Sequence, residues 1–327
     1  MESKTTLISV LLLVFVSVCL ATDPKDICPP RDLIKPCYCE KSCVKCHVSL
    51  KCDKVLDQDV LTDVVRKSND YQYATFELRD SSVQYVPASL FSIQKIESLY
   101  IFNSSMVSWF DEAPKVNYDF DVLHLNDVRM SRSIQWDLFS SFKSIKRISI
   151  MHTTLRRLDE SFKNNIPKNL KELRVYNCSL SRLHDSIFSS FTQLVTLELD
   201  FGKIKEVKRS MFPSPCKLKR LTISFQKLSE LPGDLFSNMP DLKELQLVGN
   251  LLSELTKDTF ASIVPKLTTF KIHDNPIKCG CSIHWITSID RSKWRGPWFS
   301  GKCTAPKELE GKELKDLNNS HFQHCRE

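Results

Sequence analysis

Residues 242–260 read LKELQLVGNLLSELTKDTF, and the apolar spacing of this stretch decides the fold. Leucines stand at 242, 245, 247, 252 and 255, with an asparagine at 250 and a phenylalanine at 260. The same spacing occurs three more times upstream, beginning at Leu170, Leu194 and Leu218. In these copies the asparagine is replaced by Cys178, Gly202 and Gln226. One short unit is therefore repeated almost in register.

The form LxxLxLxxNxLxxL is that of the leucine-rich repeat. Each unit holds a strand of about three residues and a turn, and its apolar side chains become buried only when neighbouring units stack. The asparagine side chain is suited to bonding the backbone of the adjoining turn. We therefore expect Cys178, Gly202 and Gln226 to fill that position imperfectly.

Looser copies extend the array in both directions, beginning at Tyr73, Ile96, Phe120, Ile145 and Leu267. About nine repeats, 23 to 25 residues apart, are thus predicted over residues 61–277. The predicted fold is an α/β repeat, namely a curved right-handed solenoid with a parallel β-sheet on its concave face. A solenoid grows coil by coil, so 327 residues need no second core.

Composition and motifs argue against catalysis and nucleic-acid binding. The chain has only 7 glycines, and it contains no P-loop, GxSxG or HExxH motif, so neither an enzyme nor a cofactor site is expected. The net charge of +7 is modest, and basic residues are interspersed with acids such as Glu172 and Glu244. His124 and His152 fall on adjacent predicted strands, where surface histidines are expected.

The first residues predict a secretory signal peptide. Lys4 precedes an apolar run from Leu7 to Leu20, and small residues around Ala21 suit a signal peptidase. Cleavage after residue 21 would deliver the chain to the extracellular space. No later stretch approaches the roughly twenty apolar residues of a membrane span, so no membrane anchor is expected.

Cysteine placement predicts a cap at each end of the repeats. Of the twelve cysteines outside the signal segment, six lie between Cys28 and Cys52 and four between Cys279 and Cys325. Only Cys178 and Cys216 fall inside the repeats, and these two are expected to remain unpaired. Disulfide-bonded caps over residues 22–60 and 278–327 would cover the open ends of the solenoid.

The C-terminal string NPIKCGC at 275–281, followed by Trp285, Cys303 and Cys325, resembles the flank of secreted and cell-surface leucine-rich-repeat proteins. That resemblance implies the pairs Cys279–Cys303 and Cys281–Cys325.

The N-terminal pattern C…CxC…C resembles the opposite flank of the same proteins, which implies Cys28–Cys39 and Cys37–Cys52. Cys43 and Cys46 are left over. A structural disulfide between them is favoured, with redox exchange or a zinc site beside His47 as the alternatives.

The run CPPRDLIKPCYC at 28–39 is similar to the opening of secreted arthropod leucine-rich-repeat proteins, a group that includes a non-catalytic subunit of a luciferin monooxygenase. This resemblance implies a binding or stabilising role, without catalysis, as an accessory subunit of an extracellular complex.

Residues between the inward strand positions point out from the concave face and are the candidates for contact with a partner. An aromatic band from three consecutive repeats, Tyr176, Phe201 and Phe225, is expected to form one patch, unless the two phenylalanines pack sideways against a neighbouring turn. The predicted partner-binding residues are Tyr100, Phe102, Met151, Arg174, Tyr176, Glu198, Asp200, Phe201 and Phe225. The expected partner is an extracellular protein or glycoprotein. Self-association as a matrix or cuticle protein is the alternative.

Three sequons begin at Asn103, Asn177 and Asn318. Glycosylation is expected at Asn103 and Asn318. Asn177 is expected to remain unoccupied, because Cys178 stands at the middle position of its sequon and because a sugar there would cover Tyr176.

Overall fold

The structure is a computed structural model that describes residues 27–42, 47–290 and 298–325. The predicted signal peptide, residues 1–21, and the expected Cys43–Cys46 bridge lie outside the described residues. None of the helices in the described ranges is both long enough and apolar enough to span a bilayer.

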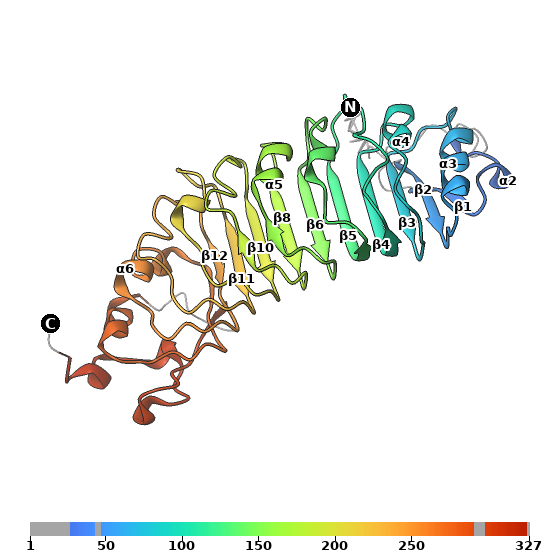
Figure 1. Ribbon diagram of the computed structural model, residues 1–327. Helices are drawn as coiled ribbons and strands as arrows, with labels where there is room; N and C mark the ends of the chain where they lie inside the picture. Colours follow the sequence, from blue (N-terminus) through green and yellow to red (C-terminus); the bar gives the residue numbers. More distant parts are fainter. Residues whose placement is uncertain (1–26, 43–46, 291–297, 326–327) are drawn as a thin grey trace, which may run out of the picture.

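The described chain forms one curved sheet of 12 strands, which lie side by side along an arc (Figure 1). The first two strands pair in antiparallel fashion, and every other neighbouring pair is parallel. In sheet order the strands are β1 (Cys37–Ser42), β2 (His47–Asp53), β3 (Thr75–Arg79), β4 (Ser98–Met106), β5 (Val122–Met130), β6 (Arg147–Met151), β8 (Glu172–Tyr176), β10 (Thr196–Asp200), β11 (Arg220–Ser224), β12 (Glu244–Gln246), β13 (Thr269–Lys271) and β14 (Phe299–Ser300).

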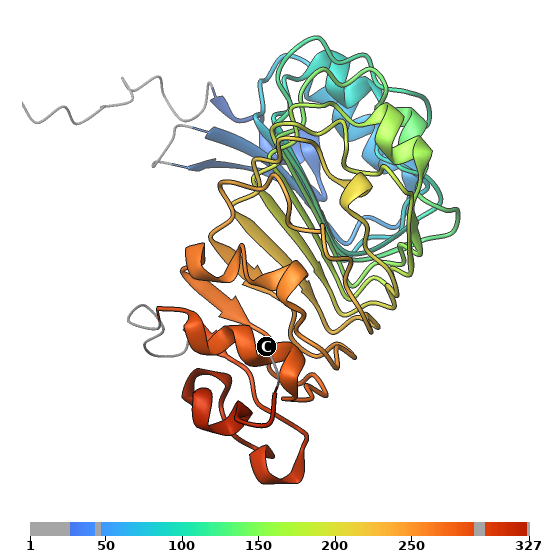
Figure 2. The ribbon, with the colours of Figure 1, turned by 90° about the vertical axis from the view of Figure 1, so that its left-hand side faces the viewer.

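The wall opposite the sheet consists of loops and short helices (Figure 2). The α-helices are α2 (Arg31–Ile34), α3 (Gln58–Lys67), α4 (Ser89–Ile93), α5 (Glu160–Asn165) and α6 (Lys257–Phe260). The 3₁₀ helices are η1 (Trp136–Phe139), η2 (Arg209–Met211), η3 (Val264–Lys266), η4 (Cys281–Ser288), η6 (Lys307–Leu309), η7 (Leu314–Asp316) and η8 (Asn319–Phe322). Outside the large sheet, β7 (Arg157–Leu158) and β9 (Arg182–Leu183) form a separate two-stranded sheet. The predicted fold class is confirmed.

The core fills the space between the two walls. The longer strands direct two apolar side chains inward, as β10 does with Leu197 and Leu199, and both of these are buried. The recurring phenylalanine fills the opposite side of the coil, where Phe236 and Phe260 lie with their ring centroids 5.9 Å apart. Burial of this kind stabilises by roughly 25 cal/mol per Å² of apolar surface, and it requires a neighbouring repeat on each side.

Buried amides bond consecutive repeats to one another. The Asn250 side chain donates to the carbonyl of Ile223 (2.8 Å) and accepts from the backbone N–H of Leu228 (3.3 Å), both in the preceding repeat. Asn275 makes the corresponding bonds one repeat later. Because these backbone groups lie away from water, each bond satisfies a group that would otherwise be unpaired.

The prediction that Gln226 fills the asparagine position imperfectly is wrong. Its amide donates to the carbonyl of Leu199 and its oxygen accepts from the N–H of Ile204, both at 3.0 Å, as Asn250 does for the next repeat. Gly202 makes no side-chain bond, and a Cβ atom there would lie 2.5 Å from Oε1 of Gln226 and 2.7 Å from the carbonyl oxygen of Leu180. The glycine therefore leaves room for the glutamine of the next repeat.

Disulfide bonds lie near both ends of the sheet. They join Cys28 to Cys39, Cys37 to Cys52, Cys279 to Cys303 and Cys281 to Cys325. In the C-terminal cap, Trp285 on η4 donates from its indole nitrogen to the carbonyl of Leu255 (2.8 Å), which attaches the cap to the preceding coil.

Cys178 and Cys216 are buried and form no disulfide. The Cys178 thiol donates to the carbonyls of Ile150 (3.2 Å) and Tyr176 (3.1 Å), in the manner of the asparagine of other repeats. Burial raises the pKa of this thiol to about 11, so it is a structural group and not a reactive one.

Candidate functional site

The concave sheet presents alternate residues of each strand to solvent, and all of the predicted contact residues lie on this surface or at its edge. Tyr100 and Phe102 lie on β4 and Met151 on β6, and all three are half-buried. Arg174 and Tyr176 lie on β8, and Glu198 and Asp200 lie on β10. Phe201 and Phe225 directly follow β10 and β11 and are 40% and 39% exposed.

One position of the repeat adopts a left-handed backbone conformation in ten successive coils: it directly follows β2, β3, β6, β8, β10 and β11, lies within β4 and β5, and comes three residues after β12 and β13. These residues are Lys54, Asp80, Asn103, Asp127, His152, Asn177, Phe201, Phe225, Gly249 and Asp274. Glycine, asparagine and aspartate tolerate this conformation, whereas for other residues it costs roughly 1 to 2 kcal/mol. Phe201 and Phe225, with φ of 54° and 52°, are therefore the residues least suited to it by backbone preference.

Four rings form a continuous row along this edge of the sheet, which we call the aromatic ladder: His152, Tyr176, Phe201 and Phe225. Ring centroids are 5.3 Å apart for His152 and Tyr176, 5.0 Å for Tyr176 and Phe201, and 4.3 Å for the stacked pair Phe201 and Phe225. Phe225 in turn covers Gly249, since a Cβ atom there would lie 2.4 Å from its ring. The phenylalanines therefore pack sideways on their neighbours and also remain exposed.

His152 was not among the predicted contact residues. Its side chain extends the ladder by one repeat, and its Nδ1 lies 3.1 Å from the Asn177 amide nitrogen. The sequence held a signal for it, because His152 occupies the same place in its repeat as Phe201 and Phe225 do in theirs.

A second aromatic group lies on the N-terminal half of the concave face. Phe102 lies 5.3 Å from His124 and 6.2 Å from Tyr100, and the guanidinium of Arg79 lies 4.4 Å from the centre of the Phe102 ring. Burial lowers the pKa of His124, which favours the neutral ring. Arg79 was also missed as a contact residue.

An open depression of about 450 Å³ separates the two aromatic groups. It is lined by Phe102, Asn103, Asn126, Asp127 and His152. Met151 lies beside it, opposite Asn126 and Tyr176 in the strand register. The structure thus gathers Tyr176, Phe201 and Phe225 into one patch and places Tyr100 and Phe102 in another.

Charged residues beside the ladder neutralise one another across strands. Arg174 contacts Glu172 (2.5 Å) and Glu198 (3.2 Å), and Arg220 contacts Glu198 (3.6 Å) and Glu244 (2.7 Å). This chain of ion pairs crosses β8, β10, β11 and β12. Because opposite charges alternate along it, the chain of ion pairs leaves little net charge on this part of the concave face.

Asp200 differs from these paired acids. Burial, with a smaller contribution from the nearby Glu198, raises the pKa of its carboxyl to about 6, although the backbone N–H of Ser224 donates to it (3.1 Å) and opposes the shift. Asp200 lies next to Phe201 in the chain, so a group that titrates near pH 6 adjoins the ladder.

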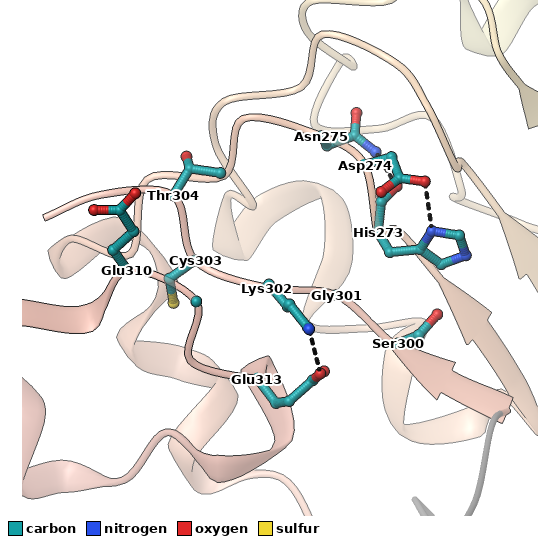
Figure 3. A pocket seen from close by; sticks show the side chains of 11 residues that line it. His273, Asp274, Asn275, Ser300, Gly301, Lys302, Cys303, Thr304, Glu310 and Glu313 are labelled. Atoms are coloured by element: carbon teal, nitrogen blue, oxygen red, sulfur yellow. Dashed lines mark hydrogen bonds and ion pairs between the residues drawn. The ribbon is translucent and has the colours of Figure 1, made fainter. Parts of the chain in front are cut away.

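A depression of about 580 Å³ lies where the last repeat meets the C-terminal cap (Figure 3). Two pairs of its side chains are in contact, His273 with Asp274 (3.0 Å) and Lys302 with Glu313 (3.4 Å), whereas Glu310, which also lines it, forms no ion pair with a described residue. The sulfur of Cys303, which also lines it, is bonded to Cys279. The described residues of this depression therefore include no free thiol.

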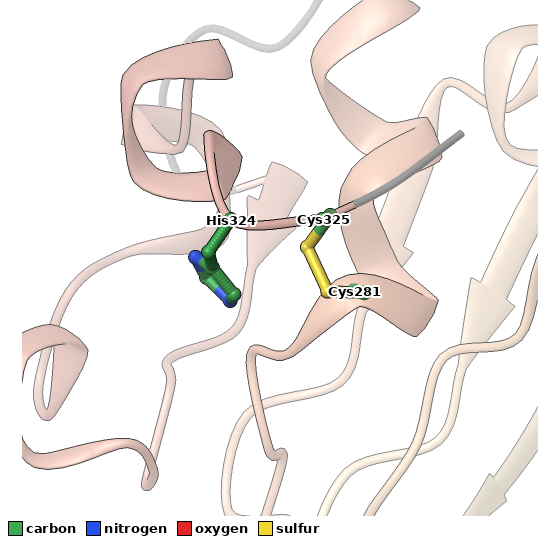
Figure 4. A group of neighbouring side chains, drawn as sticks. All are labelled: Cys281, His324 and Cys325. Carbon is green, nitrogen blue, oxygen red and sulfur yellow. A yellow bond between two sulfur atoms is a disulfide. The ribbon is translucent and has the colours of Figure 1, made fainter.

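Cys281, His324 and Cys325 bring three potential metal-ligand atoms within 4.8 Å of one another (Figure 4). The two sulfur atoms are joined in a disulfide bond. Metal binding by cysteine needs thiolates, so this donor set does not fit a zinc site.

Two protein-family models agree with this architecture. A family model described as "Leucine rich repeat" matches residues 216–277, and one described as "BspA type Leucine rich repeat region (6 copies)" matches residues 116–243. Among solved structures, the chain is similar to a chain of the octameric complex of Latrophilin 3 (Lec, Olf), Unc5D (Ig, Ig2, TSP1) and FLRT2 (LRR). The two are 19% identical, with a TM-score of 0.46, over 75% of this chain and 89% of that one.

None of the curated proteins matches this chain, so the resemblance to secreted arthropod proteins stays a prediction. The regular strands, the buried amides and the two family models agree on the architecture. The protein is a leucine-rich-repeat protein with disulfide-bonded cysteines at both ends of its solenoid.

Proposed function

We propose that this protein is a secreted, non-enzymatic binding module that recognises an extracellular protein or glycoprotein through its concave face. The observation that carries the proposal is the aromatic ladder. Phe201 and Phe225 stack at 4.3 Å and still leave about two-fifths of their surface exposed. Exposed, pre-ordered aromatic rings are the residues that most often dominate the energy of a protein interface.

Backbone energetics support this use of the ladder. Six of the other eight coils place asparagine, aspartate or glycine at the left-handed position, where these residues are accommodated at little cost, and the remaining two place Lys54 and His152 there. Two consecutive phenylalanines at this position weaken the fold by roughly 1 to 2 kcal/mol each, and their mutual stacking returns about 0.5 to 1.5 kcal/mol. A contribution to binding explains why the rings stand there despite an unfavourable backbone.

The surroundings of the ladder suit a partner that is itself partly polar. The ion pairs of Arg174 and Arg220 form a rim beside the rings, and the depression next to Phe102 gives the concave face a recess. Interfaces commonly combine a desolvated aromatic centre with such a polar rim. On this basis the binding residues are the ladder together with Arg174, Glu198 and Asp200, and Tyr100, Phe102 and Met151 extend the surface towards the N-terminus.

Extracellular location is part of the proposal. Disulfide bonds form and persist in oxidising compartments. Residues 1–21 also have the pattern of a secretory signal. We assign the N-terminal cap to residues 22–60, about nine repeats to 61–277 and the C-terminal cap to 278–327. The proposed role as the accessory subunit of an extracellular complex is supported only by the resemblance of residues 28–39 to secreted arthropod leucine-rich-repeat proteins.

Glycans would limit where the partner docks. Asn318 is exposed, and its side-chain oxygen accepts from the N–H of Ser320 at the start of η8, so we propose that it carries a glycan. Asn103 is exposed too, although its amide nitrogen donates to Asp80 (2.7 Å), and a glycan on it would stand over the depression beside Phe102. Glycosylation at Asn103 would therefore confine docking to the ladder and the repeats after it.

The test is a comparison of partner capture by matched variants. Tyr176→Ala and Phe201→Ala are each immobilised beside wild-type protein and exposed to extracellular fluid of the source organism. Proteins that wild type retains and both variants lose, with affinity weakened by about 5- to 150-fold, or about 1 to 3 kcal/mol, support the ladder as the binding site.

Leu56→Ala and Leu251→Ala are the controls. Both side chains are apolar, 75% and 49% exposed, and outside the ladder, and capture should be unchanged by their truncation. Equal capture by all four variants would place the binding site elsewhere. Light scattering on the purified protein addresses self-association, since a concentration-dependent mass that Phe201→Ala abolishes would make a second copy the partner.

A further inference from the structure

A second feature of the surface lies outside the concave sheet, around the two-stranded sheet of β7 and β9. An open depression of about 680 Å³ occupies this flank. Four arginines, Arg132, Arg156, Arg157 and Arg182, line it, together with a single carboxylate, Asp159. All four arginine residues are exposed.

Three of these arginines occupy equivalent positions in consecutive repeats. Arg157 and Arg182 are directly paired in the register of β7 and β9, and Arg132 precedes Arg157 by one repeat of 25 residues, as Arg182 follows it by 25. Paired strands lie about 4.8 Å apart, so Arg157 and Arg182 are close neighbours, and Arg132 occupies the equivalent position of the preceding repeat. We call Arg132, Arg156, Arg157 and Arg182 the arginine column.

The positive charge of the column is largely uncompensated. Asp159 contacts Nε of Arg157 (3.0 Å), but its carboxylate also accepts from the backbone N–H groups of Ser161 (3.2 Å) and Phe162 (3.4 Å) as the N-cap of α5. Arg132, Arg156 and Arg182 form no ion pair with any described residue. Like charges on adjacent strands repel, so the arrangement weakens the fold in the absence of an anion.

The column is confined to one part of the solenoid. In the next three repeats the position of Arg182 is taken by Glu206, Glu230 and Glu254. This flank therefore changes from basic to acidic along its length, which gives an anionic ligand a defined place. The remaining lining of the depression includes the exposed hydroxyl side chains of Ser131 and Ser133, which are further hydrogen-bond donors.

We propose that the arginine column binds a sulfated polysaccharide. Guanidinium groups bind oxyanions through two parallel N–H donors, and sulfate esters spaced along a linear sugar chain match cations that recur in consecutive repeats. An open depression admits a continuous chain, whereas an enclosed pocket would admit only its end. The disulfide bonds are typical of the oxidising, extracellular setting in which such polysaccharides are found.

The site is independent of the proposed concave-face function, because β7 and β9 are not part of the 12-stranded sheet. The test measures binding of heparin, a sulfated polysaccharide, to the full protein at several salt concentrations. The triple variant Arg132→Ala, Arg156→Ala, Arg182→Ala removes the three unpaired cations and keeps the contact of Arg157 with Asp159. It should weaken heparin binding at least tenfold and reduce its dependence on salt.

The matched control is Lys95→Ala, Lys143→Ala, Lys266→Ala, which loses the same charge from exposed sites elsewhere in the solenoid. It should change binding less than twofold, and both variants should keep the wild-type melting temperature. If the two triple variants lose binding equally, the attraction is a property of net charge and the proposal is overturned.

Two further probes identify the ligand class. Heparin stripped of its sulfates should not bind. Polyglutamate that binds through the column as tightly as heparin would assign the site to an acidic protein and would overturn the proposal. Phe201→Ala should bind heparin as wild type does, so failure of the concave-face proposal and failure of this one are separable.

Discussion

Replacement of Asn250 by alanine tests how the repeats are held together. The side chain is only 3% exposed, donates to the carbonyls of Ile223 (2.8 Å) and Leu247 (3.0 Å), and accepts from the N–H of Leu228 (3.3 Å). Alanine cannot make these hydrogen bonds. At least two backbone groups of the preceding repeat, the carbonyl of Ile223 and the N–H of Leu228, then stay buried without them. Each unsatisfied buried group costs about 1 to 3 kcal/mol, so for two such groups Asn250→Ala should lower the free energy of unfolding by about 2 to 6 kcal/mol.

Urea denaturation, followed by circular dichroism, measures that loss. Because solenoid repeats can open separately, amide hydrogen exchange supplies a local readout. Exchange of the Leu228 amide should accelerate, while the N-terminal repeats around β4 should be unaffected. The control is Asn164→Ala, since Asn164 is exposed on α5 and lies outside the set of buried amides that join the repeats.

A loss below about 0.5 kcal/mol, or unchanged exchange at Leu228, would refute this reasoning. Either outcome would mean that water or backbone rearrangement satisfies the turn, and that apolar burial alone joins the repeats.

Three further perturbations address other parts of the chain. Gly202→Asn restores the repeat consensus yet should lower the melting temperature, because its Cβ atom would lie 2.5 Å from Oε1 of Gln226; a rise would contradict the account of that turn. Cys279→Ser opens the bond to Cys303 and should cost about 2 to 5 kcal/mol in chemical denaturation, and an unchanged midpoint would make the cap dispensable. Burial raises the pKa of Asp200 to about 6, so between about pH 4 and pH 6 the native state binds more protons than the unfolded chain, and stability falls as pH rises through this range. Asp200→Asn should flatten that part of the stability curve, and an unchanged slope would assign the effect to another group.

The fold class could be predicted from the sequence because it depends on a local rule. Leucine at alternate positions, as at Leu245 and Leu247, can be buried only if the segment is a strand with both side chains on one face, and recurrence every 23 to 25 residues stacks such strands in parallel. The same rule placed Tyr176 and Glu198 on the outward face before any contact was known.

The contacts between repeats were less predictable. Gln226 satisfies the preceding turn only because Gly202 leaves space for its longer side chain, a dependence between residues 24 positions apart. His152 joins the aromatic ladder because its backbone has the left-handed conformation that also orients Phe201, and the identity of a histidine does not encode that conformation.

The sequence alone determined the solenoid and the faces of its strands, because burial of a repeated apolar pattern admits one arrangement. The sequence also predicted that Tyr176, Phe201 and Phe225 form one patch, but only the tertiary structure decided how their rings contact one another and that His152 joins them. Contact between Phe201 and Phe225 at 4.3 Å depends on the register of β10 and β11, on the turn after each strand and on side-chain orientation. No apolar period fixes these quantities, since each is set by packing across neighbouring coils.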